Sequence, residues 1–445
     1  MRRIFSEENK YKLWRKIWVE LARAQSKMGL VSKEELEDLE KHQENLDIER
    51  IWEIEKDTRH DVVAAIKEFA EKAKVGGGKI HLGATSMDIS DNAETIRISE
   101  ALGLVEDELI KLLKTFGKQI EKYSDHVCMG YTHLQPAEPT TLGYRLALYA
   151  QDLLMDLELL EFVKKNLKGK GMKGVVGTSA SYVKLMGERE AEQMEEEVLE
   201  GLGGLEAFEI TSQTSPRKIE VWVADLLSSI AQSLNKFAFD VRIMQSPGFG
   251  EWQEPFGEKQ VGSSAMPFKK NPWKSEQICS LARLIVSLSR TSWDNASSML
   301  LERTLDDSAN RRVAIPEMFL AIDEMLTSVT NIVDGLIINE SRVNKNLDTY
   351  WPFSASEGII IEAVKKGADR QKMHEVLRKI SMEAWNAIQS GKANPLEDLL
   401  ESNPEIEKYL TSEELLKLMD AKNHIGNAKN KALTISKKIA NLKNR

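Results

Sequence analysis

The sequence predicts a mainly α-helical protein built around a long helical bundle. Two observations support this fold class. First, apolar residues recur at three- and four-residue steps over several stretches, and from Ile219 to Met244 they do so without a gap. Second, the alternation of apolar and polar residues that would indicate strands is not convincing anywhere in the chain. Helices of about 25 residues joined by polar loops would form a bundle about 40 Å long.

Length and charge limit the classes of protein that fit. The 445 residues suffice for about two or three domains, and 42% hydrophobic with 29% charged residues is typical of a globular protein. A net charge of −9 argues against a general nucleic-acid or membrane-surface binder. The N-terminal stretch lacks the apolar core of a signal peptide, and no apolar run matches a membrane span, so we expect a cytoplasmic protein.

Cysteines and histidines indicate neither a metal site nor a disulfide framework. Cys128 and Cys279 are too few and too isolated, and we expect both to be reduced, packed thiols. The seven histidines show none of the spacings typical of metal ligands. We therefore expect neither a metal nor another cofactor.

The first 75 residues predict several helices. An apolar stripe marks the first of them: Trp14, Ile17, Trp18, Leu21 and Ala24. Ser32 and Glu35 predict a capping box at the start of the second. A further helix is expected to contain residues 53–63, where Thr58–Asp61 crowd four polar side chains into about one turn. Taken alone, this turn is interpreted as a solvated helix face.

A turn and a loop flank the next predicted helix. Residues 81–88 form the turn, in which Ser86 or Asp88 is expected to cap a helix that runs to about Ser124. Residues 129–141 form the loop, where His133 lies between a glycine and two prolines. A histidine in this setting is less suited to core packing than one on an apolar helix face.

Further long helices complete the predicted bundle. They are expected over residues 141–167, 219–244, 274–302 and 313–338. The Gly-x-Gly-x-x-Gly match at residues 169–174 follows a charged helix and no strand, so we interpret it as a turn and not as a dinucleotide site. We expect three domains: a helical domain over residues 1–86, the central bundle over 87–340, and a small domain of shorter helices over 341–445.

Residues 245–276 interrupt this helical pattern with a long loop. The loop carries four of the eleven prolines and four glycines, which break helices. A loop of this length in a compact protein is usually functional or disordered. Its second half, residues 262–272, combines hydroxyls, amines and an amide, which favours a catalytic lid over a linker. With the polar residues of the other loops, this inventory suits acid–base chemistry on an anionic substrate.

Five separated blocks resemble the fumarase/aspartase superfamily, and most closely its adenylosuccinate lyase family, in the eukaryotic-type branch. Residues 262–272 with Glu276 are similar to the signature loop of the superfamily. The other blocks are Thr58–Asp61, His81–Ser86, Thr132–Ala137 and Glu302–Arg312. The blocks follow the family's order and span nearly the whole chain.

The resemblance implies a fumarase/aspartase-like three-domain fold and a β-elimination. The reaction would release fumarate from adenylosuccinate, giving AMP, and from the purine precursor SAICAR, giving AICAR. The implied catalytic residues are Ser263 as the base, His133 as the acid, and His60, Lys269 and Glu276 in support. For Glu276, an acidic residue in the first turn of a helix is an equally good interpretation. The residues implied to bind substrate are Arg59, His60, Asp61, Thr85, Ser86, Gln213, Met266, Asn271, Arg303, Ser308 and Arg312.

The resemblance also implies a homotetramer whose long helices form a shared core, with each active site built from three subunits. Its partners would be a small purine nucleotide and further copies of the chain, without nucleic acid or membrane. Relatives usually begin with an additional segment whose Arg-Tyr pair contacts substrate, and Met1 lies where that segment would be ending. Arg2 or Arg3 would then take its place, or substrate affinity would be lower, or the natural start would lie earlier.

Three alternatives stay open from the sequence. Argininosuccinate lyase shares the wording of residues 130–135, but its signature loop does not typically read Ala-Met-Pro-Phe-Lys. Carboxymuconate cycloisomerases have a similar loop but typically lack the histidine at position 133. An inactive helical scaffold would be expected to lose these loop residues first. In addition, Gln277 stands where the eukaryotic-type branch tends to have arginine.

Overall fold

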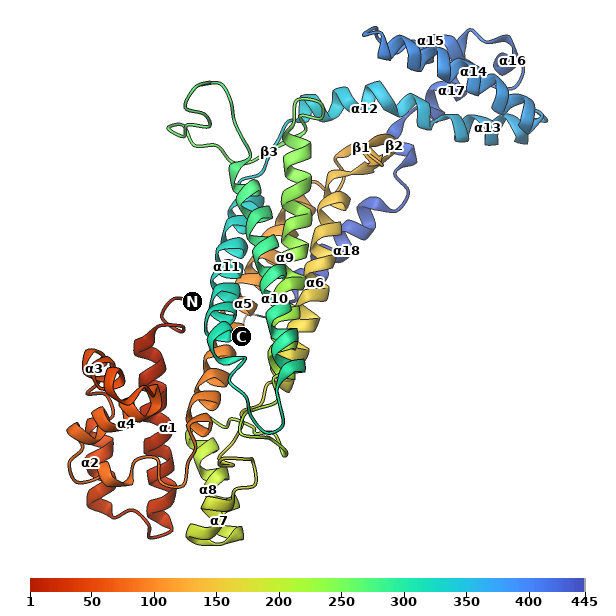
Figure 1. Cartoon of the computed structure of the whole chain (residues 1–445). Helices are drawn as coiled ribbons and strands as arrows, with labels where there is room; N and C mark the ends of the chain where they lie inside the picture. The colour runs from red at the N-terminus through yellow and green to blue at the C-terminus, as the bar shows by residue number, and fades with distance from the viewer. Residues whose placement is uncertain (444–445) are drawn as a thin grey trace. The chain divides into compact units, whose positions relative to one another are not determined.

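The computed structural model describes residues 1–443 and forms two compact units (Figure 1). Unit 1 comprises Met1–Glu108, Asp156–Gln232 and Ser280–Met325. Unit 2 comprises Leu109–Met155, Ser233–Cys279 and the chain from Leu326 onward. The division into domains at residues 86 and 340 stays a prediction.

Five long helices contribute residues to both units. They are α5 (Ser86–Lys122), α6 (Leu142–Asn166), α9 (Lys218–Gln245), α10 (Trp273–Ser298) and α11 (Ser308–Asp334). All five were expected from apolar spacing, which confirms the mainly α-helical fold class. The expected boundaries differ most at α11, which begins at Ser308 and includes Pro316, whereas the apolar pattern placed its start at residue 313.

Unit 1 contains the N-terminal helices and a short helical pair. Its remaining elements are α1 (Glu7–Lys27), α2 (Lys33–His42), α3 (Ile48–Thr58), α4 (Asp61–Lys72), η1 (Gly77–Lys79), α7 (Ala180–Met186) and α8 (Glu188–Gly201). The apolar stripe of α1 is buried in one core with residues of α4, α5 and α8. The capping box of Ser32 and Glu35 is formed at the start of α2, as predicted.

Unit 2 contains the small strands and the C-terminal helices. Its remaining elements are β1 (Val127–Thr132), β2 (Gln135–Thr141), β3 (Trp252–Gln253), β4 (Ile337–Ile338), α12 (Glu340–Ser354), α13 (Ser356–Lys365), α14 (Arg370–Gln389), α15 (Leu396–Glu401), α16 (Pro404–Glu407), α17 (Ser412–Leu418), η2 (Ala421–His424) and α18 (Ala428–Ala440). A second core joins α12–α17 to Met129 of β1. Within residues 1–443, no helix has the length and apolar composition of a membrane span.

The helix expected over residues 53–63 is in fact two helices. Helix α3 ends at Thr58, and Arg59 adopts a left-handed conformation with φ of 53°. His60 then caps α4, where its Nδ1 accepts a hydrogen bond from the Val63 N–H at 3.4 Å. The polar turn is therefore a sharp bend and not a solvated helix face, because the left-handed residue redirects the chain.

The loop expected over residues 129–141 is in fact a β-hairpin, so the prediction of no strands was wrong here. β1 and β2 pair antiparallel from Val127 opposite Thr141 to Thr132 opposite Gln135. His133 and Leu134 form the two-residue turn, with φ of 53° and 61°. Positive φ at both positions is the geometry of the turns that join short hairpins. His133 thus stands at the exposed tip of a paired ribbon.

Candidate active site

A cavity of about 1140 Å3 lies within unit 1. Its walls come from α1, α3, the start of α4, the start of α5, the segment before α9, the turn before α11 and the first turns of α11. Nine residues implied to bind substrate line it: Arg59, His60, Asp61, Thr85, Ser86, Gln213, Arg303, Ser308 and Arg312. Four sequence blocks far apart in the chain therefore meet at one cavity.

Backbone turns present these side chains. The bend at Arg59 places three consecutive polar residues at the cavity. Thr85 and Ser86 stand where α5 begins, and the Thr85 N–H donates to the Asp88 carboxylate at 2.9 Å. A helix N-terminus offers free N–H groups and a positive dipole end, which favours an anionic ligand.

Ion pairs hold two of the arginines. Arg312 donates to Asp61 Oδ2 at 3.0 Å, which ties the start of α11 to the start of α4. Arg303 donates through Nη1 to Asp307 Oδ1 at 2.8 Å. Both guanidiniums retain further N–H donors, since each carries five. The cavity can therefore offer charge-assisted hydrogen bonds to phosphate or carboxylate groups.

The sequence did not reveal the aromatic side of the cavity. Tyr11, Trp14 and Trp52 line it, together with Lys10, whose Nζ lies 4.3 Å from the centre of the Tyr11 ring. The apolar spacing placed Trp14 on the stripe of the first helix, and no sequence pattern singled out Tyr11 or Trp52. Burial, with Glu7 and Glu55 nearby, raises the pKa of the Tyr11 phenol, which keeps it protonated.

The residues discussed as substitutes for the N-terminal segment do not line this cavity. Neither Arg2 nor Arg3 is among its lining residues. Arg3 instead forms an ion pair with Glu100 of α5. Lys10 is thus the basic residue that α1 contributes to the cavity wall.

Asp88 anchors the glycine-rich segment under the start of α5. The carboxylate is fully buried and pairs with Lys170. It also accepts hydrogen bonds from the Gly174 N–H at 3.1 Å and the Tyr182 hydroxyl at 3.2 Å. A side chain at Gly169 would collide with Asn92, so close approach of the backbone explains this glycine. The turn predicted here is not formed: residues 169–174 are irregular backbone, and Gly169 makes an isolated parallel bridge with Ala207.

His81 lies next to this anchor and gives a pH-dependent prediction. Its Nδ1 accepts a hydrogen bond from Trp18 Nε1 at 3.1 Å, and burial lowers its pKa from 6.5 to about 4. The folded state therefore prefers neutral His81. This contribution to stability is complete above pH 6.5 and is lost as pH falls toward 4, and it amounts to about 3 kcal/mol.

We expect His81→Asn to remove this part of the pH dependence. Asparagine tolerates the positive φ of 69° at this position and can still accept from Trp18. Urea unfolding of both proteins at several pH values between 4.5 and 7 measures the effect. If lowering the pH from 7 to 4.5 reduced the unfolding free energy of both proteins equally, the prediction would be wrong.

The signature loop belongs to unit 2 and folds back on itself between β3 and α10. The Ser263 Oγ accepts a hydrogen bond from the Met266 N–H at 3.1 Å. Asn271 Nδ2 donates to the Gly262 carbonyl at 3.0 Å, closing the loop. The backbone of Lys269 passes so close to Gly262 that a Cβ there would lie 2.1 Å from its carbonyl oxygen. The Met266 and Lys269 side chains are exposed.

Gln245 joins the two ends of this loop. Its Nε2 donates to the Lys270 carbonyl at 2.9 Å, and its Oε1 accepts from the Glu254 N–H at 3.0 Å. The buried Glu254 carboxylate in turn accepts from the Ser275 N–H at 2.6 Å at the start of α10. A single side chain at the end of α9 therefore fixes both the entry and the exit of the loop.

We expect Gln245→Ala to loosen the loop without unfolding the unit. Losing two hydrogen bonds should raise proteolytic cleavage within residues 255–272 by about 5- to 30-fold. Gln245→Glu, which keeps an acceptor for Glu254 but cannot donate to Lys270, should give an intermediate rate. Cleavage of the alanine variant at the wild-type rate would show that Gln245 does not hold the loop.

A buried glutamate connects the root of the loop to the His133 hairpin. Glu251 is fully buried and accepts from the Tyr131 hydroxyl at 2.9 Å, from Arg145 at 3.1 Å and from Asn346 at 2.9 Å. Burial, with Glu251 beside it, raises the pKa of Tyr131, which therefore remains a hydrogen-bond donor. No local sequence pattern indicates this link, since its partners lie far apart in the chain.

Six predicted site residues belong to unit 2: His133, Ser263, Met266, Lys269, Asn271 and Glu276. His133 is exposed at the hairpin tip, and Glu276 is exposed in the first turn of α10. Among the predicted catalytic residues, His60 is the one that lines the cavity of unit 1. Within residues 1–443, no group of three or more His, Cys, Asp or Glu side chains could hold a metal ion.

Sequence comparisons identify close relatives. A lyase family model matches residues 1–287, and a model described as adenylosuccinate lyase C-terminus matches residues 352–432. The chain is 39% identical to adenylosuccinate lyase of Schistosoma mansoni over 89% of this chain and 83% of the relative. It is 38% identical to that of Saccharomyces cerevisiae over 95% of this chain and 89% of the relative. The adenylosuccinate lyase of Methanocaldococcus jannaschii is 39% identical over 96% of this chain and 90% of the relative.

Solved structures share the fold. A fumarate lyase from Mesorhizobium sp. BNC1 has a TM-score of 0.86 at 23% identity and covers 98% of this chain and 97% of its own. A 3-carboxy-cis,cis-muconate lactonizing enzyme from Pseudomonas putida has a TM-score of 0.87 at 25% identity, covering 99% and 97%. These similarities support the mainly α-helical fold of this superfamily.

Proposed function

The chain belongs to the adenylosuccinate lyase family, and on this premise we propose that it eliminates fumarate from adenylosuccinate to give AMP. The same step on SAICAR would give AICAR. The observation that carries the proposal beyond family membership is the meeting of nine implied substrate-binding residues at one cavity. The substrate carries a phosphate and two carboxylates, and the cavity offers several guanidiniums and a helix N-terminus.

Different lining residues of the cavity are proposed to bind different parts of the substrate. Arg303, Ser308 and Arg312 lie near the start of α11 and are proposed to bind the ribose phosphate. Thr85, Ser86 and Gln213 are proposed to hold the succinyl and base-linked portions. His60 is proposed to position the substrate, with Arg59 and Asp61 beside it. The roles of these residues are those that the family resemblance implies.

The chemistry requires one base and one acid. The base removes a proton from the carbon next to a carboxylate, the electron pair forms the C=C bond of fumarate, and the C–N bond breaks as the acid protonates the departing nitrogen. We assign the base to Ser263 and the acid to His133, because histidine is the side chain that most often transfers protons in enzymes. Lys269 and Asn271 would stabilise the carboxylate that gains negative charge.

The hydrogen bond from the Met266 N–H supports the role of Ser263. A serine hydroxyl is a poor base unless its alkoxide is stabilised. A donor aimed at Oγ, here at 3.1 Å, favours the deprotonated form over the neutral one. Met266 is therefore proposed to assist catalysis through its backbone N–H, which stabilises the deprotonated Ser263. Glu276 is proposed to orient His133 or to anchor Lys269.

Exposed apolar residues on the long helices support a homotetramer. In unit 2, Leu148 and Met155 of α6 are 54% and 59% exposed. In unit 1, Val286 and Trp293 of α10 are 51% and 47% exposed. Large apolar side chains that gather on helix faces mark surfaces for other protein chains. We propose that further copies of this chain cover them and that each active site draws residues from three subunits.

A cytoplasmic location is part of the proposal. Cys128 and Cys279 are both free and buried, which suits a reducing compartment.

Turnover of adenylosuccinate tests the proposed reaction. We expect the ultraviolet absorbance to change as AMP forms, with fumarate released in equal amount. Turnover of argininosuccinate without turnover of adenylosuccinate would overturn the proposal in favour of another lyase of the superfamily.

A further inference from the structure

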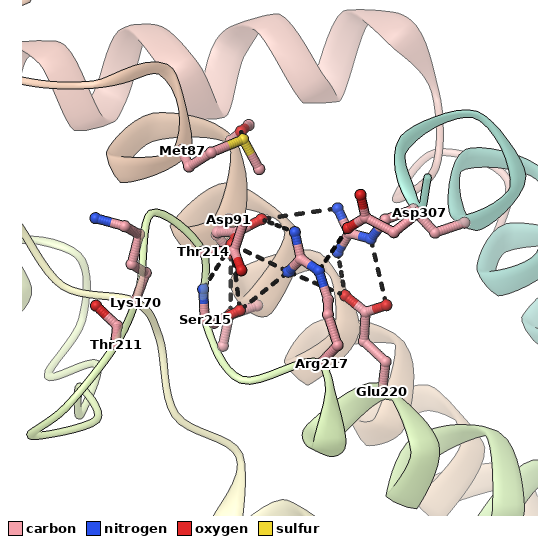
Figure 2. Close-up of polar contacts among 12 residues, drawn as sticks. Met87, Asp91, Lys170, Thr211, Thr214, Ser215, Arg217, Glu220 and Asp307 are labelled. Carbon is pink, nitrogen blue, oxygen red and sulfur yellow. Dashed lines mark hydrogen bonds and ion pairs between the residues drawn. The ribbon is translucent and has the colours of Figure 1, made fainter. Parts of the chain in front are cut away.

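Beneath the cavity of unit 1 lies a cluster of buried charged side chains, which we call the buried network (Figure 2). Its members are Asp91, Arg217, Glu220, Asp307 and Arg311. The first four are 1–4% exposed. None of the five belongs to the residues that the family resemblance implies for the site. Burying charged groups costs desolvation free energy unless they are paired. We therefore ask whether these pairs stabilise the fold or position residues of the cavity.

Arg217 is the centre of the buried network. Its Nη1 and Nη2 donate to the two oxygens of Asp91 at 3.0 and 3.2 Å, a two-pronged pairing. Its Nε donates to Asp307 Oδ2 at 2.7 Å. Figure 2 shows the guanidinium between these carboxylates, at the start of α9. One side chain thus joins α5 to the turn that precedes α11.

Asp307 connects Arg217 to Arg303, a residue that lines the cavity. While Oδ2 accepts from Arg217, Oδ1 accepts from Nη1 of Arg303 at 2.8 Å. Arg303 lies in the turn between α10 and α11, outside any helix, and lines the cavity. Asp307 is 1% exposed, whereas the Arg303 side chain is 15% exposed. A rigid, buried carboxylate therefore aims a side chain that reaches the cavity from a turn.

The same cluster also fixes the segment that carries Gln213. The Ser215 N–H donates to Asp91 Oδ2 at 2.8 Å, and the Gln213 N–H donates to the Glu302 carbonyl at 3.2 Å. With Arg303 included, three carboxylates face three guanidiniums, so the cluster is balanced in charge. Arg303 retains donors for a ligand because its guanidinium carries five N–H groups and its bond to Asp307 Oδ1 is made through Nη1.

We infer that Asp307, held by Arg217, is a positioning residue that sets the affinity of the cavity for the phosphate-bearing end of the substrate by aiming Arg303. This inference rests on the proposed function, in which Arg303 binds that phosphate. Asp307 itself is buried and acts through Arg303. Its loss should therefore raise KM far more than it lowers kcat.

A double-mutant cycle tests the inference, with KM and kcat for adenylosuccinate and the Kd of AMP as readouts. Asp307→Asn preserves shape but weakens the bond to Arg303, and we expect KM and Kd to rise about 5- to 30-fold with kcat changed less than about threefold. Arg303→Gln should raise both at least as much. In the double variant, Asp307→Asn should add nothing to Arg303→Gln.

Two further variants keep the test decisive. Arg217→Lys retains a charge for Asp91 but replaces the separate Nε and Nη donors, which bind Asp307 and Asp91, by a single ammonium group. It should therefore raise KM in the same Arg303-dependent way, even if Asp307→Asn folds poorly. Glu68→Gln alters a buried ion pair with Arg15 away from the cavity lining, and it should change stability but not KM.

The outcomes separate the two proposals. If Asp307→Asn raised KM by the same factor in the wild-type protein and in Arg303→Gln, the role of Asp307 would be merely structural. This result would overturn the inference. An unchanged KM in Asp307→Asn and Arg217→Lys, with a raised KM in Arg303→Gln, would overturn it as well. An unchanged KM in Arg303→Gln would instead refute the proposed phosphate site.

Discussion

Ser263→Ala is expected to lower kcat for fumarate release by about a thousandfold, because it removes the oxygen proposed to take the proton. The Met266 N–H would then lose its acceptor, but the loop should stay closed through the bond from Asn271 to the Gly262 carbonyl. KM should change little, since Ser263 is not among the residues lining the substrate cavity. Steady-state assay of fumarate release with adenylosuccinate measures both constants.

Ser264→Ala is the matched control for this substitution. It removes a neighbouring hydroxyl from the same loop, and Ser264 is exposed. We expect its kcat to remain within about threefold of the wild-type value and its unfolding free energy to be unchanged. If Ser263→Ala kept more than about a tenth of the wild-type kcat, another group would have to be the base.

The long helices could be predicted because a helix buried on one side repeats its apolar residues every three or four positions. Helix α9 shows this most clearly: the apolar positions from Ile219 to Val241 that predicted it are buried in the structure. The capping box at Ser32 was predictable for a similar reason, since both partners lie within one turn. Local pattern and local structure agree at these places.

The hairpin and the helix break depended on interactions that the sequence does not display locally. His133 and Leu134 adopt positive φ without the Asn-Gly or Asp-Gly pair that normally announces such a turn. Both strands are short, and β2 contains Pro136 and Pro139, which argue against strand structure. At Arg59 likewise, neither Gly nor Asn marks the left-handed residue that ends α3.

The sequence predicted one part of the candidate site and missed another, for a comparable reason. Eight of the nine implied residues that line the cavity lie in short sequence blocks similar to those of a known family, so they could be located without a structure. The buried network has no such signal, because Asp91 and Arg217 are 126 positions apart and become partners only in the fold. Glu251 and Tyr131, 120 positions apart, escaped notice in the same way.

Mixing two inactive variants tests whether sites are shared between subunits. His133→Ala and Ser263→Ala should each be nearly inactive alone, because one lacks the proposed acid and the other the proposed base. If a site takes His133 from one subunit and Ser263 from another, random mixed tetramers should contain about a quarter of sites with both groups intact. Co-refolding equal amounts of the two variants and measuring fumarate release gives the result, with each variant refolded alone as the control.

The outcome depends on where the two groups reside in one chain. His133 and Ser263 both belong to unit 2, whereas the residues proposed to bind the phosphate line the cavity of unit 1. Glu251 binds the His133 hairpin to the root of the signature loop in the same chain, so each variant should leave the other group correctly supported. Activity should therefore return in the mixture without any change in either fold. Mixed tetramers that stay as inactive as their parents would mean that one subunit supplies both groups to each site.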